Sequence, residues 1–109
     1  MINVLLVCNQ GTSISMFIKK ITDYAQGKGI ETAVEAVAFV KVPDLVDKTD
    51  IMLIGPQARH LYKKMQSEYG AKIPVIQVMD MASFGLLKAD KIFDAAYKEY
   101  SVKAGSAPV

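Results

Sequence analysis

Four strand-length apolar segments, separated by helix-like patterns, constrain the fold of this chain most. Three are nearly continuous runs of branched apolar residues, Ile2–Val7, Ile51–Ile54 and Val75–Val78, and in the fourth, Thr32–Phe39, Val37 interrupts a strict alternation. Strands that are apolar at almost every position are typical of parallel sheets, because crossover helices cover both faces. The pattern therefore predicts an α/β fold with a four-stranded parallel sheet and helices on both faces.

The segments between and after these strands carry helix signals. Gly27 and Gly29 are expected to stop the first helix and Gly70 the second, while Pro43 predicts a short helix or turn within Val40–Lys48. The expected long helices are Ser13–Gln26, Ala58–Glu68 and a last one from Leu86 or Ala89 to Tyr100.

Length and composition limit the domain organisation. With 109 residues, of which 51% are hydrophobic, the chain fits one domain with a substantial core. We expect that domain to cover residues 1–100 and residues 101–109 to form a flexible C-terminal tail.

Charge and cysteine usage exclude several classes of function. The formal net charge is only +2, with acidic and basic residues interleaved, so a nucleic-acid partner is not expected. The single cysteine forms no internal disulfide, and neither a secretory signal nor an apolar run of about 20 residues is present. These features favour a reducing, cytoplasmic location.

The first strand leads into a short polar loop and then a helix, and the cysteine stands where the strand ends. The loop comprises Asn9, Gln10, Gly11, Thr12, Ser13, Ile14 and Ser15. A loop that enters a helix directs unpaired backbone N–H groups into one small volume, which favours phosphate. The same field lowers the pKa of a thiol, so Cys8 is expected to be a reactive thiolate.

Strand order predicts which segments surround Cys8. Parallel sheets bind ligands beyond the carboxyl ends of their strands, at a switch in strand order, and a flavodoxin-like order of 2-1-3-4 places the first strand beside that switch. The turn at Gly55-Pro56-Gln57 and the segment Met79-Asp80-Met81 follow the third and fourth strands. Both are therefore expected at the same edge of the sheet as Cys8.

Two enzyme classes with a related loop lack their central residue here. Low-molecular-weight tyrosine phosphatases and thiol-dependent arsenate reductases need an Arg six residues after the Cys, where its guanidinium grips the phosphoryl oxygens. Ile14 occupies that position, and the second cysteine that the reductases require is absent. A phosphatase with an unusual loop stays open only as a remote alternative.

The loop resembles the lactose/cellobiose-type enzyme IIB of the bacterial sugar phosphotransferase system. Its signature is a strand-terminal Cys followed by Gly and Ser/Thr residues, and the similarity extends to about Tyr100. The matching residues are Cys8, Gly11, Ser13, Ser15, Met16, Leu53-Ile54-Gly55-Pro56-Gln57, Pro74-Val75-Ile76 and Phe84-Gly85.

The resemblance implies a phosphoryl relay that needs neither a metal nor a cofactor. Cys8 accepts the phosphoryl group from a phosphohistidine of enzyme IIA, and residues 9–15 bind its oxygens through backbone N–H groups and hydroxyls. A sugar held in the membrane component, enzyme IIC, then takes the group during uptake. The resemblance thus implies a phosphotransferase that associates with the inner face of the membrane through enzyme IIC. A monomer is our default expectation for the oligomeric state.

Other interpretations accompany this one. The alternative function is a non-catalytic anion- or nucleotide-binding module in which Cys8 is structural. His60 is interpreted as a solvated surface residue, and Asp80 as a turn or capping residue. Met16, Phe17 and Met81 are candidates for a partner-docking patch beside the loop.

Overall fold

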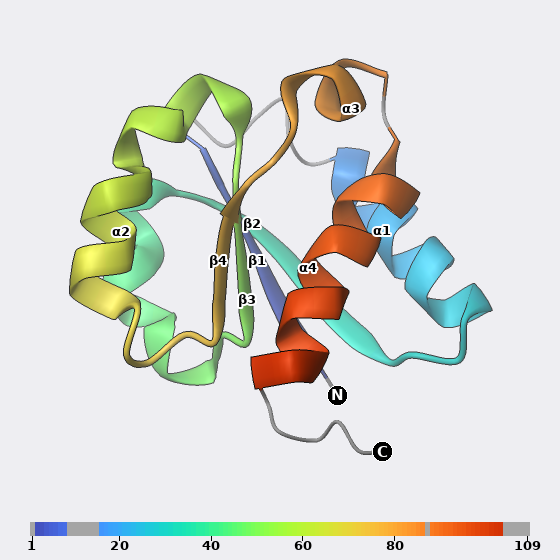
Figure 1. The fold of residues 1–109 in the computed structure, drawn as a ribbon, viewed down its shortest axis with the longest axis horizontal. Helices are drawn as coiled ribbons and strands as arrows, with labels where there is room; N and C mark the ends of the chain where they lie inside the picture. Colours follow the sequence, from blue (N-terminus) through green and yellow to red (C-terminus); the bar gives the residue numbers. More distant parts are fainter. Residues whose placement is uncertain (1, 9–15, 87, 104–109) are drawn as a thin grey trace.

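The four predicted strands form one parallel sheet. The structure is a computed structural model that describes residues 2–8, 16–86 and 88–103 (Figure 1). The strands are β1 (Ile2–Cys8), β2 (Thr32–Ala38), β3 (Ile51–Ile54) and β4 (Val75–Val78). Their order is β2-β1-β3-β4, which confirms the predicted order 2-1-3-4.

Helices cover both faces of the sheet, as expected. Helices α1 (Met16–Gly27) and α4 (Ala89–Lys103) lie on one face, and α2 (Tyr62–Tyr69) lies on the other (Figure 1). A fourth short helix, α3 (Met81–Gly85), lies at the end of the sheet where the strands terminate (Figure 1). Among the described residues, no helix has the length and apolar character needed to cross a bilayer.

The sheet separates two apolar clusters because successive side chains of a strand point to opposite faces. The upper cluster, on the α1 and α4 side, contains Val4 and Leu6 of β1 with the buried rings of Phe17 and Phe93. The lower cluster contains the intervening β1 residues, Leu5 and Val7, with residues of β3, β4 and α2. Leu6 and Val7 are both fully buried, which explains the nearly continuous apolar sequence of the central strands.

The short helix or turn expected within Val40–Lys48 is found as two 3₁₀-helices, Phe39–Asp44 and Val46–Lys48, with Pro43 inside the first. Two other predicted segments differ from the structure. The helix expected at Ala58–Glu68 begins as the 3₁₀-helix Pro56–Leu61, in which Ala58 leaves helical geometry before α2 starts. Helix α4 continues to Lys103, so residues 101–103 belong to it and not to the expected tail.

The end of α1 is a Schellman motif centred on Gly29. The Ile30 N–H donates to the Ala25 carbonyl at 2.9 Å, and the Gly29 N–H donates to the Gln26 carbonyl at 3.0 Å. Gly29 has a φ of 77°, the left-handed conformation that side chains disfavour, whereas Gly27 is still helical. Of the two glycines expected to stop this helix, Gly29 therefore has the conformational role.

Gly29→Ala is expected to destabilise the fold by about 1 kcal/mol, because alanine is strained in the left-handed region. Gly27→Ala is the matched control, since a Cβ there meets no atom within 4 Å and the residue is helical. This control is expected to stabilise by about 0.4–1 kcal/mol. Urea denaturation of both variants measures the two changes in the free energy of unfolding. If both variants are destabilised, or both stabilised, this account of the helix end is wrong.

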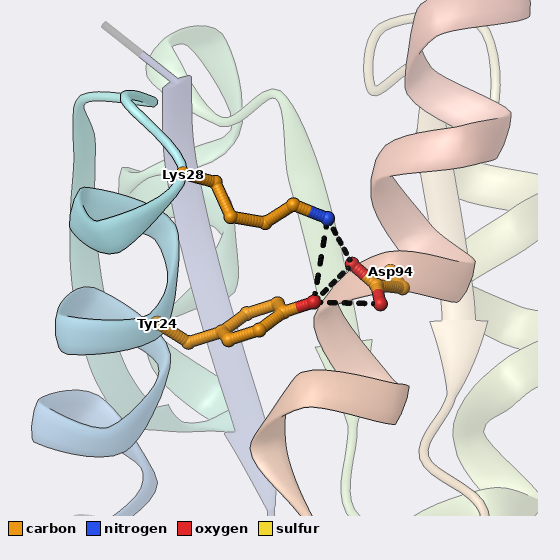
Figure 2. Close-up of polar contacts among 3 residues, drawn as sticks. All are labelled: Tyr24, Lys28 and Asp94. Carbon is orange, nitrogen blue, oxygen red and sulfur yellow. Dashed lines mark hydrogen bonds and ion pairs between the residues drawn. The ribbon is translucent and has the colours of Figure 1, made fainter.

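Helices α1 and α4 are also joined by a polar cluster at their exposed side (Figure 2). The Tyr24 hydroxyl donates to the Asp94 carboxylate, with oxygen distances of 2.8 and 2.9 Å, and the Lys28 ammonium lies 3.3 Å from both partners. The hydrogen bond from Tyr24 lowers the pKa of Asp94. Hydrogen bonding to Asp94 raises the pKa of Tyr24, and hydrogen bonding to Tyr24 raises the pKa of Lys28.

Tyr24→Phe is expected to lower the thermal midpoint slightly, because it removes the donor of this exposed cluster. The lowered pKa of Asp94 means that its contribution is present above its ordinary value of 3.8 and is lost as the pH falls. The raised pKa of Tyr24 means that its contribution is present below 10.0 and is lost as the pH rises. The difference in thermal midpoint between Tyr24→Phe and wild type should therefore be largest between pH 3.8 and pH 10.0. Thermal unfolding measured from acid to alkaline pH tests this.

Tyr62→Phe is the control for that series, since it removes a tyrosine hydroxyl that is not part of the cluster of Tyr24, Lys28 and Asp94. It should show no such pH dependence. A difference in thermal midpoint between Tyr24→Phe and wild type that is constant over the whole pH range would contradict a stabilising role of the Tyr24–Asp94 hydrogen bond.

Candidate functional site

Cys8 is the last residue of β1 and lies at the carboxyl edge of the sheet. It pairs in register with Ala38, the last residue of β2, while the preceding Val7 pairs with Ile54, the last residue of β3. Because β1 lies between β2 and β3, the chain leaves it at the switch in strand order. This is the position at which open parallel sheets bind ligands.

The predicted phosphate-binding residues Asn9, Gln10, Gly11, Thr12, Ser13, Ile14 and Ser15 lie outside the described residues. Their two flanks are described. The chain enters this segment from β1 and leaves it into α1, which begins at Met16 (Figure 1). The strand and the helix on either side of the segment are those expected from the sequence.

The two other segments expected at this edge are found there. The Gly55 N–H donates to the Val7 carbonyl at 2.8 Å, which extends the pairing of β1 and β3 by one residue. In the same way, the Met79 N–H donates to the Ile54 carbonyl at 2.8 Å beyond the end of β4. The turn after β3 is thus hydrogen-bonded to β1, and the turn after β4 is hydrogen-bonded to β3. Both turns therefore lie at the edge of the sheet where β1 ends.

Asp80 caps the short helix that follows β4. Its carboxylate accepts a hydrogen bond from the Ser83 N–H at 2.9 Å, and Asp80 itself has the extended backbone of an N-cap residue. The capping role expected for this residue is therefore confirmed. Its carboxylate is engaged with the backbone of α3.

The candidate docking residues separate into exposed and buried ones. The side chains of Met16 and Met81 are 54% and 63% exposed, whereas Phe17 is fully buried. Leu86, which follows α3, is 68% exposed. Exposed large apolar side chains are thus found on the first residue of α1, on the first residue of α3 and directly after α3, whereas Phe17 belongs to the core.

In the described part of the chain, the polar residues near this edge include no second candidate for catalysis. His60 is exposed on the segment that precedes α2, as expected for a surface histidine. Within residues 2–8, 16–86 and 88–103, no group of three His, Cys, Asp or Glu side chains is placed to hold a metal ion.

One contact at this edge was missed by sequence reasoning. The ring of Phe84 in α3 stacks on the ring of Phe17 in α1, with centroids 5.0 Å apart and an angle of 15° between the planes. The two residues are separated by most of the chain, so no local pattern pairs them. The available signals were the apolar character of Phe84 and its place among the residues that match the enzyme IIB family.

Comparison with known proteins identifies relatives of this chain. The family model described as "PTS system, Lactose/Cellobiose specific IIB subunit" matches residues 3–95. The oligo-beta-mannoside-specific EIIB component of the PTS system from Bacillus subtilis (strain 168) is 33% identical over 93 residues, which are 85% of this chain and 90% of that protein.

Two solved structures share the fold. The cellobiose-specific phosphotransferase IIB component from Borrelia burgdorferi has a TM-score of 0.75 and 30% identity, covering 94% of each chain. The lactose-specific IIB component domain of the phosphoenolpyruvate:carbohydrate phosphotransferase system from Streptococcus pneumoniae has a TM-score of 0.77. It covers 91% of this chain and 97% of that one at 19% identity, which is a likeness of fold alone.

Proposed function

Because the chain belongs to the lactose/cellobiose-specific IIB subunit family of the sugar phosphotransferase system, we propose that Cys8 carries a phosphoryl group between two partners. The position of Cys8 is the observation that best supports this role. It ends the central strand β1 at the switch in strand order, and it is the only cysteine in the chain. A thiolate at such a position is a suitable nucleophile for phosphorus.

The donor in this proposal is a phosphohistidine of enzyme IIA. The Cys8 sulfur attacks phosphorus in line, so that the S–P bond forms as the N–P bond breaks and the histidine nitrogen keeps the electron pair. Backbone N–H groups of residues 9–15 and the hydroxyls of Thr12, Ser13 and Ser15 then hold the phosphoryl oxygens.

The acceptor is a sugar hydroxyl in the membrane component, enzyme IIC. Its oxygen attacks the phosphorus of the thiophosphate, the O–P bond forms as the S–P bond breaks, the hydroxyl proton is released to solvent, and the Cys8 thiolate is regenerated. We propose a sugar of the lactose/cellobiose type, which agrees with the cellobiose and oligo-β-mannoside named for the relatives.

The apolar rim formed by Met16, Met81 and Leu86 is a candidate surface for docking the donor. All three side chains are more than half exposed; Met16 and Met81 are the first residues of α1 and α3, and Leu86 follows α3. Exposed apolar side chains that gather at one edge are typical of protein interaction sites. Met81→Ser is therefore expected to raise the donor concentration needed for half-maximal transfer.

Phosphorylation of the intact protein tests the proposed function. The chain is incubated with phosphoenolpyruvate, the general phosphotransferase enzymes and a lactose/cellobiose-type enzyme IIA, and is then analysed by intact mass and phosphorus NMR. One thiol-linked phosphoryl group per chain is the expected result. A folded, reduced protein that accepts none from several such IIA partners would favour the anion-binding alternative.

A further inference from the structure

A basic surface covers the outer side of the segment that leads from β3 into α2. Its four residues are exposed and belong to the 3₁₀-helix η3 (Pro56–Leu61) and to α2: Arg59, His60, Lys63 and Lys64. The residues that alternate with them, Ala58, Leu61 and Met65, are buried in the lower cluster. The segment is thus amphipathic, and its basic residues face away from the sheet.

Few acidic residues accompany the basic surface. Residues 55–67 contain no Asp or Glu, so Arg59, Lys63 and Lys64 each add an uncompensated positive charge to this stretch, in a chain whose net charge is only +2. The one acid of α2 lies at the far end of the helix. The 3₁₀-helix Phe39–Asp44, which packs on the same lower cluster, carries one base and one acid, so it leaves the balance unchanged.

The basic surface begins beside the strand end that carries Cys8. The Gly55 N–H donates to the Val7 carbonyl at 2.8 Å, and the Ala58 N–H donates to the Gly55 carbonyl at 2.9 Å. These bonds hold the start of η3 at the carboxyl end of β1. From there α2 runs along the face of the sheet opposite to α1 and α4 (Figure 1).

The strand end at Cys8 therefore lies between two surfaces of different chemistry. The apolar rim of Met16, Met81 and Leu86 is found at α1 and α3, whereas the basic surface is on η3 and α2. Within the described part of the chain, none of the exposed large apolar side chains lies on η3 or α2. Protein interfaces are centred on desolvated apolar side chains, whereas attraction to a charged membrane requires only opposite charge.

We propose that the basic surface binds anionic phosphate headgroups of the inner leaflet when Cys8 serves enzyme IIC. The choice of a membrane rests on the proposed function, in which the acceptor sugar is held in a membrane protein. Each Lys or Arg close to an anionic leaflet strengthens binding about fivefold, so three such side chains give a weak, reversible contact. Reversibility suits a carrier that must leave the membrane again to meet enzyme IIA.

Vesicle binding tests this proposal without any phosphoryl transfer. The chain is sedimented with vesicles of phosphatidylglycerol and phosphatidylcholine in equal amounts, and with vesicles of phosphatidylcholine alone. It is expected to bind only the anionic vesicles and to be released when the salt concentration is raised to about 0.5 M, because salt screens the attraction. The double variant Lys63→Gln, Lys64→Gln should bind them about 10- to 30-fold more weakly.

The double variant Lys48→Gln, Lys98→Gln is the matched control, because it removes the same charge from other surfaces. Both lysines are exposed, and both are remote from the carboxyl edge: Lys48 lies before the start of β3, and Lys98 lies in the second half of α4. This control should bind anionic vesicles almost as wild type does, since charges beyond a screening length contribute little. If it loses as much binding as the Lys63 and Lys64 variant, net charge alone explains the effect and the proposal is wrong.

The remaining outcomes separate a membrane from a protein partner. A wild-type chain that binds neither kind of vesicle, or binds both equally, overturns the proposal. If it binds neither but the Lys63 and Lys64 variant needs more phosphorylated enzyme IIA for half-maximal transfer at low salt, the basic surface fits an acidic protein instead. Phosphoryl acceptance by wild type is measured separately, so its absence would overturn the proposed function while vesicle binding still reports on the basic surface.

Discussion

Cys8→Ser is expected to lower phosphoryl acceptance from phospho-IIA by at least about 1,000-fold. A serine hydroxyl is almost fully protonated at neutral pH, so the anionic nucleophile is lost while the size of the side chain is nearly kept. Transfer to sugar through enzyme IIC should be lost with it, because the relay has no other cysteine to use. Radiolabel transfer from phosphoenolpyruvate measures the first step, and sugar phosphate production measures the second.

The control for this variant is the fold itself. Far-UV circular dichroism and thermal unfolding of Cys8→Ser should resemble those of wild type, since the substitution changes one atom at the end of β1. Cys8→Ala should be equally inactive. A Cys8→Ser protein that still accepts a phosphoryl group at a wild-type rate would contradict the phosphocysteine proposal and favour a structural role for Cys8.

The strands could be predicted because burial on two faces leaves a direct mark on the sequence. Segments such as Ile51–Ile54, in which every residue is buried, have no polar position to be confused with a surface helix. The edge strand β2 is harder to recognise, because Ala33 and Glu35 are exposed and its alternation is imperfect. Strand order then followed from the flavodoxin-like arrangement and the resemblance to IIB proteins, both of which the comparisons support.

The segments that were predicted least precisely are those whose geometry is set by tertiary packing. A short helix or turn was expected around Pro43, and the two 3₁₀-helices found there bury Val42 and Val46 in the lower cluster. Helix α3 is too short to show a periodic pattern, and its N-cap Asp80 was its only local signal. Local propensity is a weak guide in such short segments.

At the candidate site, the sequence predicted that Cys8 ends the first strand, but it did not predict the long-range contacts of the helices near that edge. Cys8 could be assigned to the carboxyl edge because it directly follows the apolar run Ile2–Val7, which marks where the strand ends. The Phe17–Phe84 stack and the Tyr24–Asp94 contact join residues 67 and 70 positions apart. Contacts of this kind depend on the crossing of α1 with α3 and α4, which periodicity does not specify.

Phe93→Ala is expected to destabilise the protein by about 3–5 kcal/mol, the usual cost of truncating a buried aromatic side chain. Phe93 is fully buried and lies between the rings of Tyr24, at 6.1 Å, and Tyr97, at 5.6 Å. It therefore joins α1 to α4 beneath the exposed polar cluster. Its removal leaves a cavity between these two helices.

That loss is a large part of the stability of a domain of this size, which is about 5–15 kcal/mol. The midpoint of thermal unfolding should fall by roughly 15 °C or more, since about 1 kcal/mol shifts it by 4–8 °C in a domain of 60–100 residues. Val102→Ala is the matched control on the same helix, because Val102 is 71% exposed and should change stability by less than about 0.5 kcal/mol. Equal midpoints for the two variants would mean that α4 does not pack on the sheet through Phe93.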